Sequence, residues 1–344
     1  MRLSLLGLMC ALLLGGCGAE ASARAEVAAA STGIATPAAS TAMPVEVTAT
    51  PTPAPATATL MPPPAPQAAP VVQVVVLQAP KDPTTITPLS RTSGDRIRTV
   101  VIDPGHAEDE VGAAASGVVE KHSNLEMAFR VEALLAAQGV RVILTRRADE
   151  RAYTGQAISG FSATRRDLQA RIDLANDSRA DLFISIHSNG SLSGADRGVE
   201  TYYNSQRPFS DQNRMLAATL QSSVVSEMAD AGYPAVDRGH KADTCLRAFQ
   251  GRCFPLFVLG PARVTTRDEV IQRGGSLDTL GFTTVQTATT SRATEMPGAL
   301  VELLFVSSPE DAALLRGEDS RAALARGVAR GILEFLRTTP PRAG

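Results

Sequence analysis

Three short aliphatic segments, each next to a chemically reactive side chain, constrain the fold of this chain most strongly. Their Val, Ile and Leu content, bounded by Gly, Pro or polar residues, is typical of buried strands. They span residues 98–103, 182–187 and 299–305. His106 follows the first segment, His187 closes the second and Glu302 lies inside the third. Because open α/β sheets bind ligands beyond the carboxyl ends of their strands, we expect these side chains in one cleft.

A fourth candidate, Glu120, precedes the helical pattern of residues 125–138, and we expect it in the loop before that helix. Two His and one Glu suit zinc and leave its fourth coordination position open for water, as in zinc hydrolases. Each residue alone has a plainer interpretation. A His at a strand end is often only hydrogen-bonded, and Glu120 alone fits a surface loop. Glu302 differs, because a carboxylate inside an apolar strand is costly to bury.

The motifs around these residues occur in a recognisable order. They lie at residues 103–106, 120–125, 142–146, 171–176, 180–189, 198–202 and 299–307. In this order they resemble the zinc-dependent N-acetylmuramoyl-L-alanine amidases of type 3, which cleave the amide between muramic acid and the stem peptide of peptidoglycan. The resemblance implies a three-layer α/β fold, the zinc ligands His106, Glu120 and His187, and Glu302 as the catalytic carboxylate. Zn²⁺ is then the cofactor and peptidoglycan the substrate.

The chain departs from the family pattern at several positions. Ala107 and Glu108 stand where Gly-Gly is usual, Leu304 where Gly is common, and Ser308 where Asn is frequent. None of these changes removes a proposed ligand or the catalytic carboxylate. Two other interpretations stay open: a non-catalytic or regulated wall-binding relative, and a different zinc hydrolase such as a peptidase or deacetylase. Their reaction products would distinguish them.

The N-terminal residues indicate export from the cell. Residues 1–16 have the charged start, short apolar core and small-residue exit of a signal peptide. The sequence Leu-Gly-Gly-Cys that ends at Cys17 resembles a lipobox, which implies a lipid anchor on that cysteine; a plain signal peptide with an incidental cysteine is the alternative. We therefore expect a membrane-anchored lipoprotein in the extracytoplasmic part of a bacterial cell envelope.

Composition divides the rest of the chain into two parts. Residues 17–93 are rich in Ala, Pro and Thr and cannot build a core, so we expect a disordered linker. Residues 94–340 suit a single catalytic domain. Helical spacing of apolar residues alternates there with the strand segments, which predicts an α/β sheet with helices on both faces. The helical patterns lie at residues 167–176, 211–228 and 319–336.

Residues 240–297 are long for a connection and lack steady periodicity, so we expect a groove wall or lid. A lid would be compatible with control by a protein activator. Cys245 and Cys253 lie within this segment and either pair in an oxidising exterior or, less in keeping with their surroundings, bind a metal. His122 is expected to face solvent, and His240 to lie in an exposed loop or approach the cleft. The net charge of −2 gives no reason to expect nucleic acid as a partner.

Overall fold

The computed structural model describes residues 96–154, 160–244, 247–249 and 252–341. The expected signal peptide, the Cys17 anchor, the whole linker and Cys245 lie outside the described residues. Within them, none of the helices is both long and apolar enough to cross a membrane.

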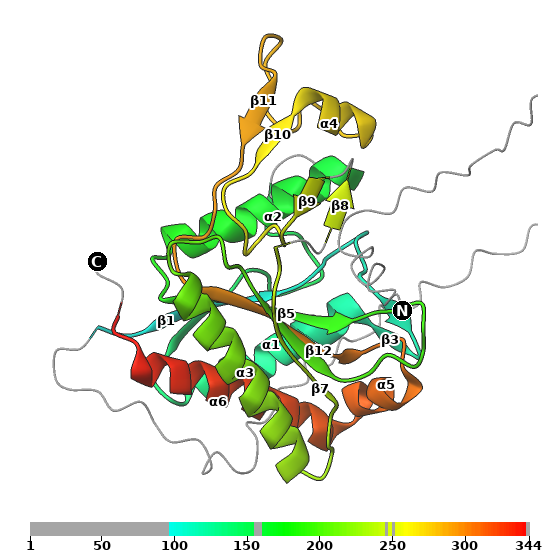
Figure 1. Ribbon diagram of the computed structural model, residues 1–344, viewed down its shortest axis with the longest axis vertical. Coiled ribbons are helices and arrows are strands. Elements are labelled where there is room, and N and C mark those ends of the chain that lie inside the picture. The colour runs from blue at the N-terminus through cyan, green and yellow to red at the C-terminus, as the bar shows by residue number, and fades with distance from the viewer. Residues whose placement is uncertain (1–95, 155–159, 245–246, 250–251, 342–344) are drawn as a thin grey trace, which may run out of the picture. The chain divides into compact units, whose positions relative to one another are not determined.

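A six-stranded sheet forms the middle layer (Figure 1), with the strand order β4-β1-β5-β12-β6-β7. The first four strands are parallel; β6 is antiparallel to β12, and β7 is parallel to β6. The strands are β1 Thr99–Pro104, β4 Arg141–Leu144, β5 Leu182–Asn189, β6 Val199–Tyr203, β7 Asp237–Ala242 and β12 Gly298–Phe305. The three predicted strands correspond to β1, β5 and β12, whereas β4, β6 and β7 were not predicted as strands.

Helices cover both faces of the sheet. The helices are α1 Glu120–Ala136, α2 Gly160–Asp177, α3 Ser210–Asp230, α4 Arg267–Gln272, α5 Pro309–Arg316 and α6 Glu318–Thr338. One core joins α1, α3 and α6 to one face, whereas residues of α2 pack on the other, and Figure 1 shows α2 across the sheet from α3 and α6. The predicted three-layer α/β fold is confirmed. Each of the four predicted helical patterns lies in a helix, namely α1, α2, α3 and α6.

Side-chain alternation determines which residues face which layer. On β5, Leu182, Ile184 and Ile186 contribute to the core with α1, α3 and α6, whereas Phe183 contributes to the core with α2. Because successive strand residues point to opposite faces, His187 points to the α2 side. The carboxyl end of β5 therefore presents its histidine on the face that α2 covers.

Short two-stranded pairs complete the structure. They are β2 Ala114–Ala115 with β3 Val118–Val119, β8 Arg247–Phe249 with β9 Arg252–Phe254, and β10 Val264–Thr266 with β11 Ala288–Thr290. The last two pairs lie in the segment expected to be a groove wall or lid. Its first residues, His240–Ala242, belong to β7 in the central sheet.

Two glycines allow α6 to approach α3 closely. A Cβ added to Gly327 would lie 2.6 Å from the Val224 Cα, and one added to Gly331 would lie 2.9 Å from the Leu220 Cα. Such distances are too short for carbon atoms, and backbone atoms of α3 cannot rotate away as a side chain can. The two helix backbones therefore need hydrogen at these positions.

We expect Gly327→Ala to destabilise the protein by about 1–3 kcal/mol, because overpacking would push α6 away from α3. Urea unfolding followed by circular dichroism measures the change. The sign of the change in the free energy of unfolding shows whether the position is crowded, since Gly→Ala at an uncrowded helix position would stabilise the protein by about 0.8–1 kcal/mol. A more stable variant would show that the helices separate without cost.

Candidate active site

The side chains of two glutamates and one histidine form a row across the central sheet. Glu302 on β12 pairs in register with His187 on β5 and with Glu200 on β6. Residues in register on neighbouring strands point to the same face, so all three lie on the α2 side, about 4.8 Å apart from strand to strand. All three are buried. The structure thus brings a predicted ligand and the predicted catalytic carboxylate together, and adds Glu200.

His106 and Glu120 approach this row from β1 and α1. Glu120 is the first residue of α1 rather than part of the preceding loop; a carboxylate is favoured in the first helical turn because the helix dipole is positive there. Its Oε1 lies 3.0 Å from His106 Nε2 and 2.9 Å from His187 Nδ1. One ligand atom from each of the three residues lies within 4.8 Å of the others. The predicted set therefore converges.

The converging groups fit a zinc ion. Both ring nitrogens of His106 are buried without a hydrogen bond, although Nε2 lies near Glu120 and Nδ1 lies 3.4 Å from Glu110 Oε1. The atoms are close to one another but their angles do not suit a hydrogen bond. Ligands on a tetrahedral zinc ion lie about 3.4 Å apart when each bond is about 2.1 Å. The donor set and spacing suit this metal.

Burial and mutual attraction shift the pKa values of the cluster. Burial opposes the charged form of Glu120, but His106 and His187 outweigh it and hold the pKa of Glu120 well below its usual range. Burial likewise opposes charge on His106, yet Glu120 and Glu110 raise its pKa to about 10. The pKa of His187 is lowered, chiefly by burial. A carboxylate held ionised is the form that binds a metal.

Glu302 has the opposite environment. Burial, and then the negative charges of Glu120 and Glu200, raise the pKa of Glu302 well above its ordinary value. Its Oε2 is buried and has no hydrogen-bond partner among the described residues. This direction follows from the cost of burying a carboxylate in an apolar strand. Two neighbouring carboxylates therefore differ in proton affinity, as an acid–base group and a metal ligand should.

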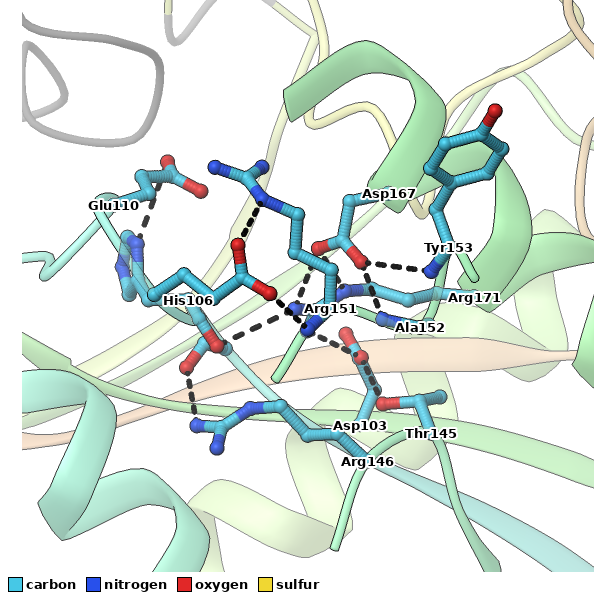
Figure 2. Close-up of polar contacts among 12 residues, drawn as sticks. Asp103, His106, Glu110, Thr145, Arg146, Arg151, Ala152, Tyr153, Asp167 and Arg171 are labelled. Atoms are coloured by element: carbon cyan, nitrogen blue, oxygen red, sulfur yellow. Dashed lines mark hydrogen bonds and ion pairs between the residues drawn. The ribbon is translucent and has the colours of Figure 1, made fainter. Parts of the chain in front are cut away.

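Buried arginines hold the backbone around the first histidine (Figure 2). Arg146 donates to the carbonyl oxygens of Pro104 and Gly105 at 2.9 and 3.0 Å, and Arg171 donates to those of Pro104 and His106 at 2.9 and 3.3 Å. Asp103 and Asp167 in turn pair with Arg171. The sequence motifs contained these residues without indicating this role. Hydrogen bonds from these buried charges to carbonyl groups fix the backbone conformation between the end of β1 and His106.

The loop after His106 is held by charges where the family usually has glycines. Glu108 has a φ of 52°, in the left-handed region that glycine favours. Its carboxylate accepts hydrogen bonds from Arg151, which also pairs with Asp109, and Lys121 Nζ donates to the Glu108 carbonyl at 2.7 Å. The departure at Ala107 and Glu108 therefore leaves the first histidine within the cluster.

Leu304 adopts a backbone conformation that favours glycine. Its φ is 69°, and the pairing of β12 with β5 shifts register between Glu302 and Phe305. This is a β-bulge immediately after the candidate catalytic residue. The Leu304 side chain is fully buried in the core with α1, α3 and α6. Burial of the Leu304 side chain in the core therefore offsets the cost of its left-handed backbone conformation.

The other sequence candidates lie apart from the cluster. The side chain of His122 is 61% exposed at the start of α1, as expected. His240 is exposed on β7, with its ring 6.1 Å from that of Tyr203. Cys253 lies in β9, but Cys245 is not described, so the proposed pairing is untested.

The part of residues 240–297 that follows β7 packs on the α2 face. Leu256, Val258, Leu259 and Met296 join the core that includes α2. Arg165 of α2 stacks over Phe257, with its guanidinium carbon 4.1 Å from the ring centroid. The segment is therefore on the same face of the sheet as the row of His187, Glu302 and Glu200.

Comparison with known families decides the identity of the domain. Residues 100–334 match the family model described as N-acetylmuramoyl-L-alanine amidase. This chain belongs to that family. LytC of Bacillus subtilis (strain 168), an N-acetylmuramoyl-L-alanine amidase, is 26% identical over 239 residues, which cover 70% of this chain and 36% of LytC. The germination-specific N-acetylmuramoyl-L-alanine amidase of the same organism is 27% identical over 240 residues, which cover 70% of this chain and 80% of that protein.

A solved structure supports the amidase fold. The CwlD amidase from Clostridioides difficile, determined in complex with the GerS lipoprotein, aligns with a TM-score of 0.50 at 20% identity, covering 70% of this chain and 100% of that one. The resemblance inferred from the motifs is thus confirmed at the level of family, fold and enzyme class. The chain spans only about a third of the length of LytC, yet most of that of the germination-specific enzyme.

Gly105→Ala is expected to disturb His187. A Cβ at Gly105 would lie 2.1 Å from the Cε1 atom of His187, so the ring must move. We expect zinc affinity to fall at least about tenfold, since loss of the groups that only orient a metal ligand typically costs about 10–100-fold. Calorimetric zinc titration measures this. Gly194→Ala is the matched control, because its Cβ would meet nothing closer than 3.4 Å. Unchanged zinc affinity in Gly105→Ala would remove His187 from the proposed ligand set.

Leu304→Gly is expected to destabilise the amidase domain by about 1–3 kcal/mol. Glycine would relieve about 1–2 kcal/mol of left-handed strain, whereas loss of a buried Leu side chain costs about 2–5 kcal/mol. Urea unfolding measures the balance. An increase in stability would mean that strain, and not packing, dominates at the bulge.

Proposed function

We propose that this enzyme hydrolyses the amide between N-acetylmuramic acid and L-alanine in peptidoglycan, with Zn²⁺ held by His106, Glu120 and His187. Glu302 is the catalytic carboxylate. The observation that carries this proposal is a buried Glu302 carboxylate, whose Oε2 has no hydrogen-bond partner among the described residues, in register with a histidine of a three-residue cluster that suits zinc. Family membership supplies the bond that is cleaved.

Amide hydrolysis requires a nucleophilic water, a stabilised carbonyl oxygen and a proton for the departing nitrogen. Zinc bound by the three ligands would supply a Lewis acid and lower the pKa of a water molecule. The Glu302 carboxylate would accept a proton from the attacking water molecule and return it to the departing nitrogen. Its raised pKa suits both steps, because a carboxylate of ordinary pKa would hold the proton too weakly. The unpaired Oε2 atom gives this proton a place to reside.

Arg146 and Arg171 orient His106. Arg146 and Arg171 bond to carbonyl groups on the strand end that carries His106, so the first histidine keeps its direction when the substrate binds. Precise placement is worth a large part of catalysis because misplaced groups lose the near-attack geometry. These residues act through the histidine and not on the substrate.

We further propose an extracytoplasmic location in the bacterial cell envelope, with a lipid anchor at Cys17 and a linker to residue 93. The substrate supports the location, and the motif at residues 14–17 supports the anchor. Residues after β7 up to 297 form one wall of the substrate groove, supported by their packing on the α2 face. A protein activator is also proposed; the structure of the CwlD amidase in complex with the GerS lipoprotein supports this, because that amidase binds a second protein.

The products of digestion test the activity. We expect the purified, zinc-loaded protein to release stem peptides with a free N-terminal alanine from peptidoglycan, and a chelator to stop the release. Mass spectrometry identifies the products. Cut peptide bonds or released acetate would instead indicate a different zinc hydrolase. No product, despite bound zinc, would favour a non-catalytic binding protein or an enzyme that awaits its activator.

Glu302→Gln is expected to lower turnover by about 10²–10⁴-fold, because the amide side chain cannot accept and return a proton. Zinc content, measured by metal analysis, should stay at the wild-type level. Glu310→Gln on α5 is the control, since that carboxylate is 64% exposed. Loss of zinc from Glu302→Gln would show that this residue is a ligand and that the assignment of roles is wrong.

A further inference from the structure

Glu200 is the feature of the row that the proposed mechanism leaves unused. It is fully buried and pairs in register with Glu302. Its Oε1 accepts hydrogen bonds from Tyr202 Oη at 2.7 Å and from Asn189 Nδ2 at 2.8 Å. A buried carboxylate beside the catalytic one raises the pKa of Glu302, but it also needs compensation by positive charge.

Two cations from β7 supply that charge. Arg238 Nε and Lys241 Nζ both donate to Glu200 Oε2, at 2.8 and 2.5 Å. One cation would suffice to neutralise one carboxylate whose other oxygen already has two donors. Arg238 and Lys241 together carry one positive charge more than the Glu200 carboxylate needs for neutralisation. A further negative group is therefore favoured beside them.

Both cations are fixed in position yet reach solvent. The side chains of Arg238 and Lys241 are 23% and 40% exposed. The guanidinium carbon of Arg238 lies 4.9 Å from the centroid of the Phe305 ring, and Lys241 Nζ lies 5.9 Å from that of Tyr202. An ammonium has three donors, and only one is needed for Glu200. Oriented, partly exposed cations are suited to bind an anion with little loss of side-chain entropy.

We propose that Arg238 and Lys241 bind a carboxylate on the residue after L-alanine in the substrate peptide, and that Glu200 positions both cations. This inference rests on the proposed function. It assigns the specificity-determining site to β7, with the metal ligands on the other side of Glu302.

The distances within the sheet allow this assignment. Strands lie about 4.8 Å apart, so the backbone of β7 is about 10 Å from the strand that carries Glu302, and the charged atoms of Arg238 and Lys241 reach back to Glu200, one strand nearer. A peptide advances about 3.3–3.6 Å per residue, so the second residue lies about 7 Å beyond the scissile amide, within the span of about 5–10 Å over which the two cationic side chains extend. A substrate that runs from the metal cluster across Glu302 therefore brings its second residue to the two cations.

The test compares N-acetylmuramoyl-L-alanyl-glutamic acid with its diamide, which lacks the carboxylates. Hydrolysis by the zinc-loaded full-length protein is measured for the wild type, Lys241→Gln and Lys241→Arg. Arg147→Gln is the control, because it removes a positive charge that pairs with Glu132 of α1. Calorimetric binding of both compounds to Glu302→Gln gives a readout that does not depend on turnover.

We expect the wild type to favour the acid over the diamide at least about tenfold in kcat/KM, through KM, since a charge-assisted hydrogen bond is worth about that factor or more. Lys241→Gln should lose about tenfold on the acid and leave the diamide unchanged. Lys241→Arg should restore most of the preference, and Arg147→Gln should retain it. The affinities for Glu302→Gln should show the same preference.

Equal kinetics and equal binding for acid and diamide would overturn the carboxylate site while leaving the amidase function intact. So would an equal loss on both compounds in Lys241→Gln, which would show that Lys241 only supports Glu200. A wild type that hydrolyses neither the compounds nor peptidoglycan would instead overturn the proposed function, and the inference would fall with it.

Discussion

The site depends on one constraint, the register between β5, β12 and β6. That register places His187, Glu302 and Glu200 side by side on the α2 face. A slip of one residue would turn Glu302 toward the core that α1, α3 and α6 form, because side chains alternate between faces. The apolar neighbours Val301 and Leu303 fix the register, since each is buried in that core. Hydrophobic packing on one face of the sheet thus sets the geometry of the chemistry on the other.

This arrangement concentrates charge in a region of low polarity, which costs free energy unless each charge has a partner. The chain meets this cost in different ways along the row. Glu120 is compensated by His106 and His187, and Glu200 by Arg238 and Lys241. Glu302 alone among the three carboxylates is left without such a cation, and its pKa is raised accordingly. The distribution of partners therefore gives three neighbouring glutamates different proton affinities.

The sequence predicted the fold and located the four candidate residues relative to the strands, because strong local patterns carried both. The apolar runs of β1, β5 and β12 and the position of His106, His187 and Glu302 relative to them could be read directly. Glu200 could not be found this way, since a glutamate in an alternating strand resembles a solvent-facing residue. Its cations lie 38 and 41 residues later, on β7, and only the sheet order brings them together.

The sequence also did not predict the backbone conformation at two positions near the site. Nothing in the residue type of Leu304 or Glu108 indicates a positive φ, and the sequence showed only that glycine was missing. In the structure, burial in the core retains Leu304, and ion pairs with Arg151 hold the loop at Glu108. Both compensations are long-range, so local propensity cannot predict them.

Anomalous diffraction at the zinc edge, from crystals of the protein grown with zinc, would locate the metal. We expect one strong peak about 2.0–2.2 Å from His106 Nε2, His187 Nδ1 and a carboxylate oxygen of Glu120, with the Glu302 carboxylate outside bonding distance. A peak bound by Glu302, or the absence of a peak between the two histidines, would contradict this expectation.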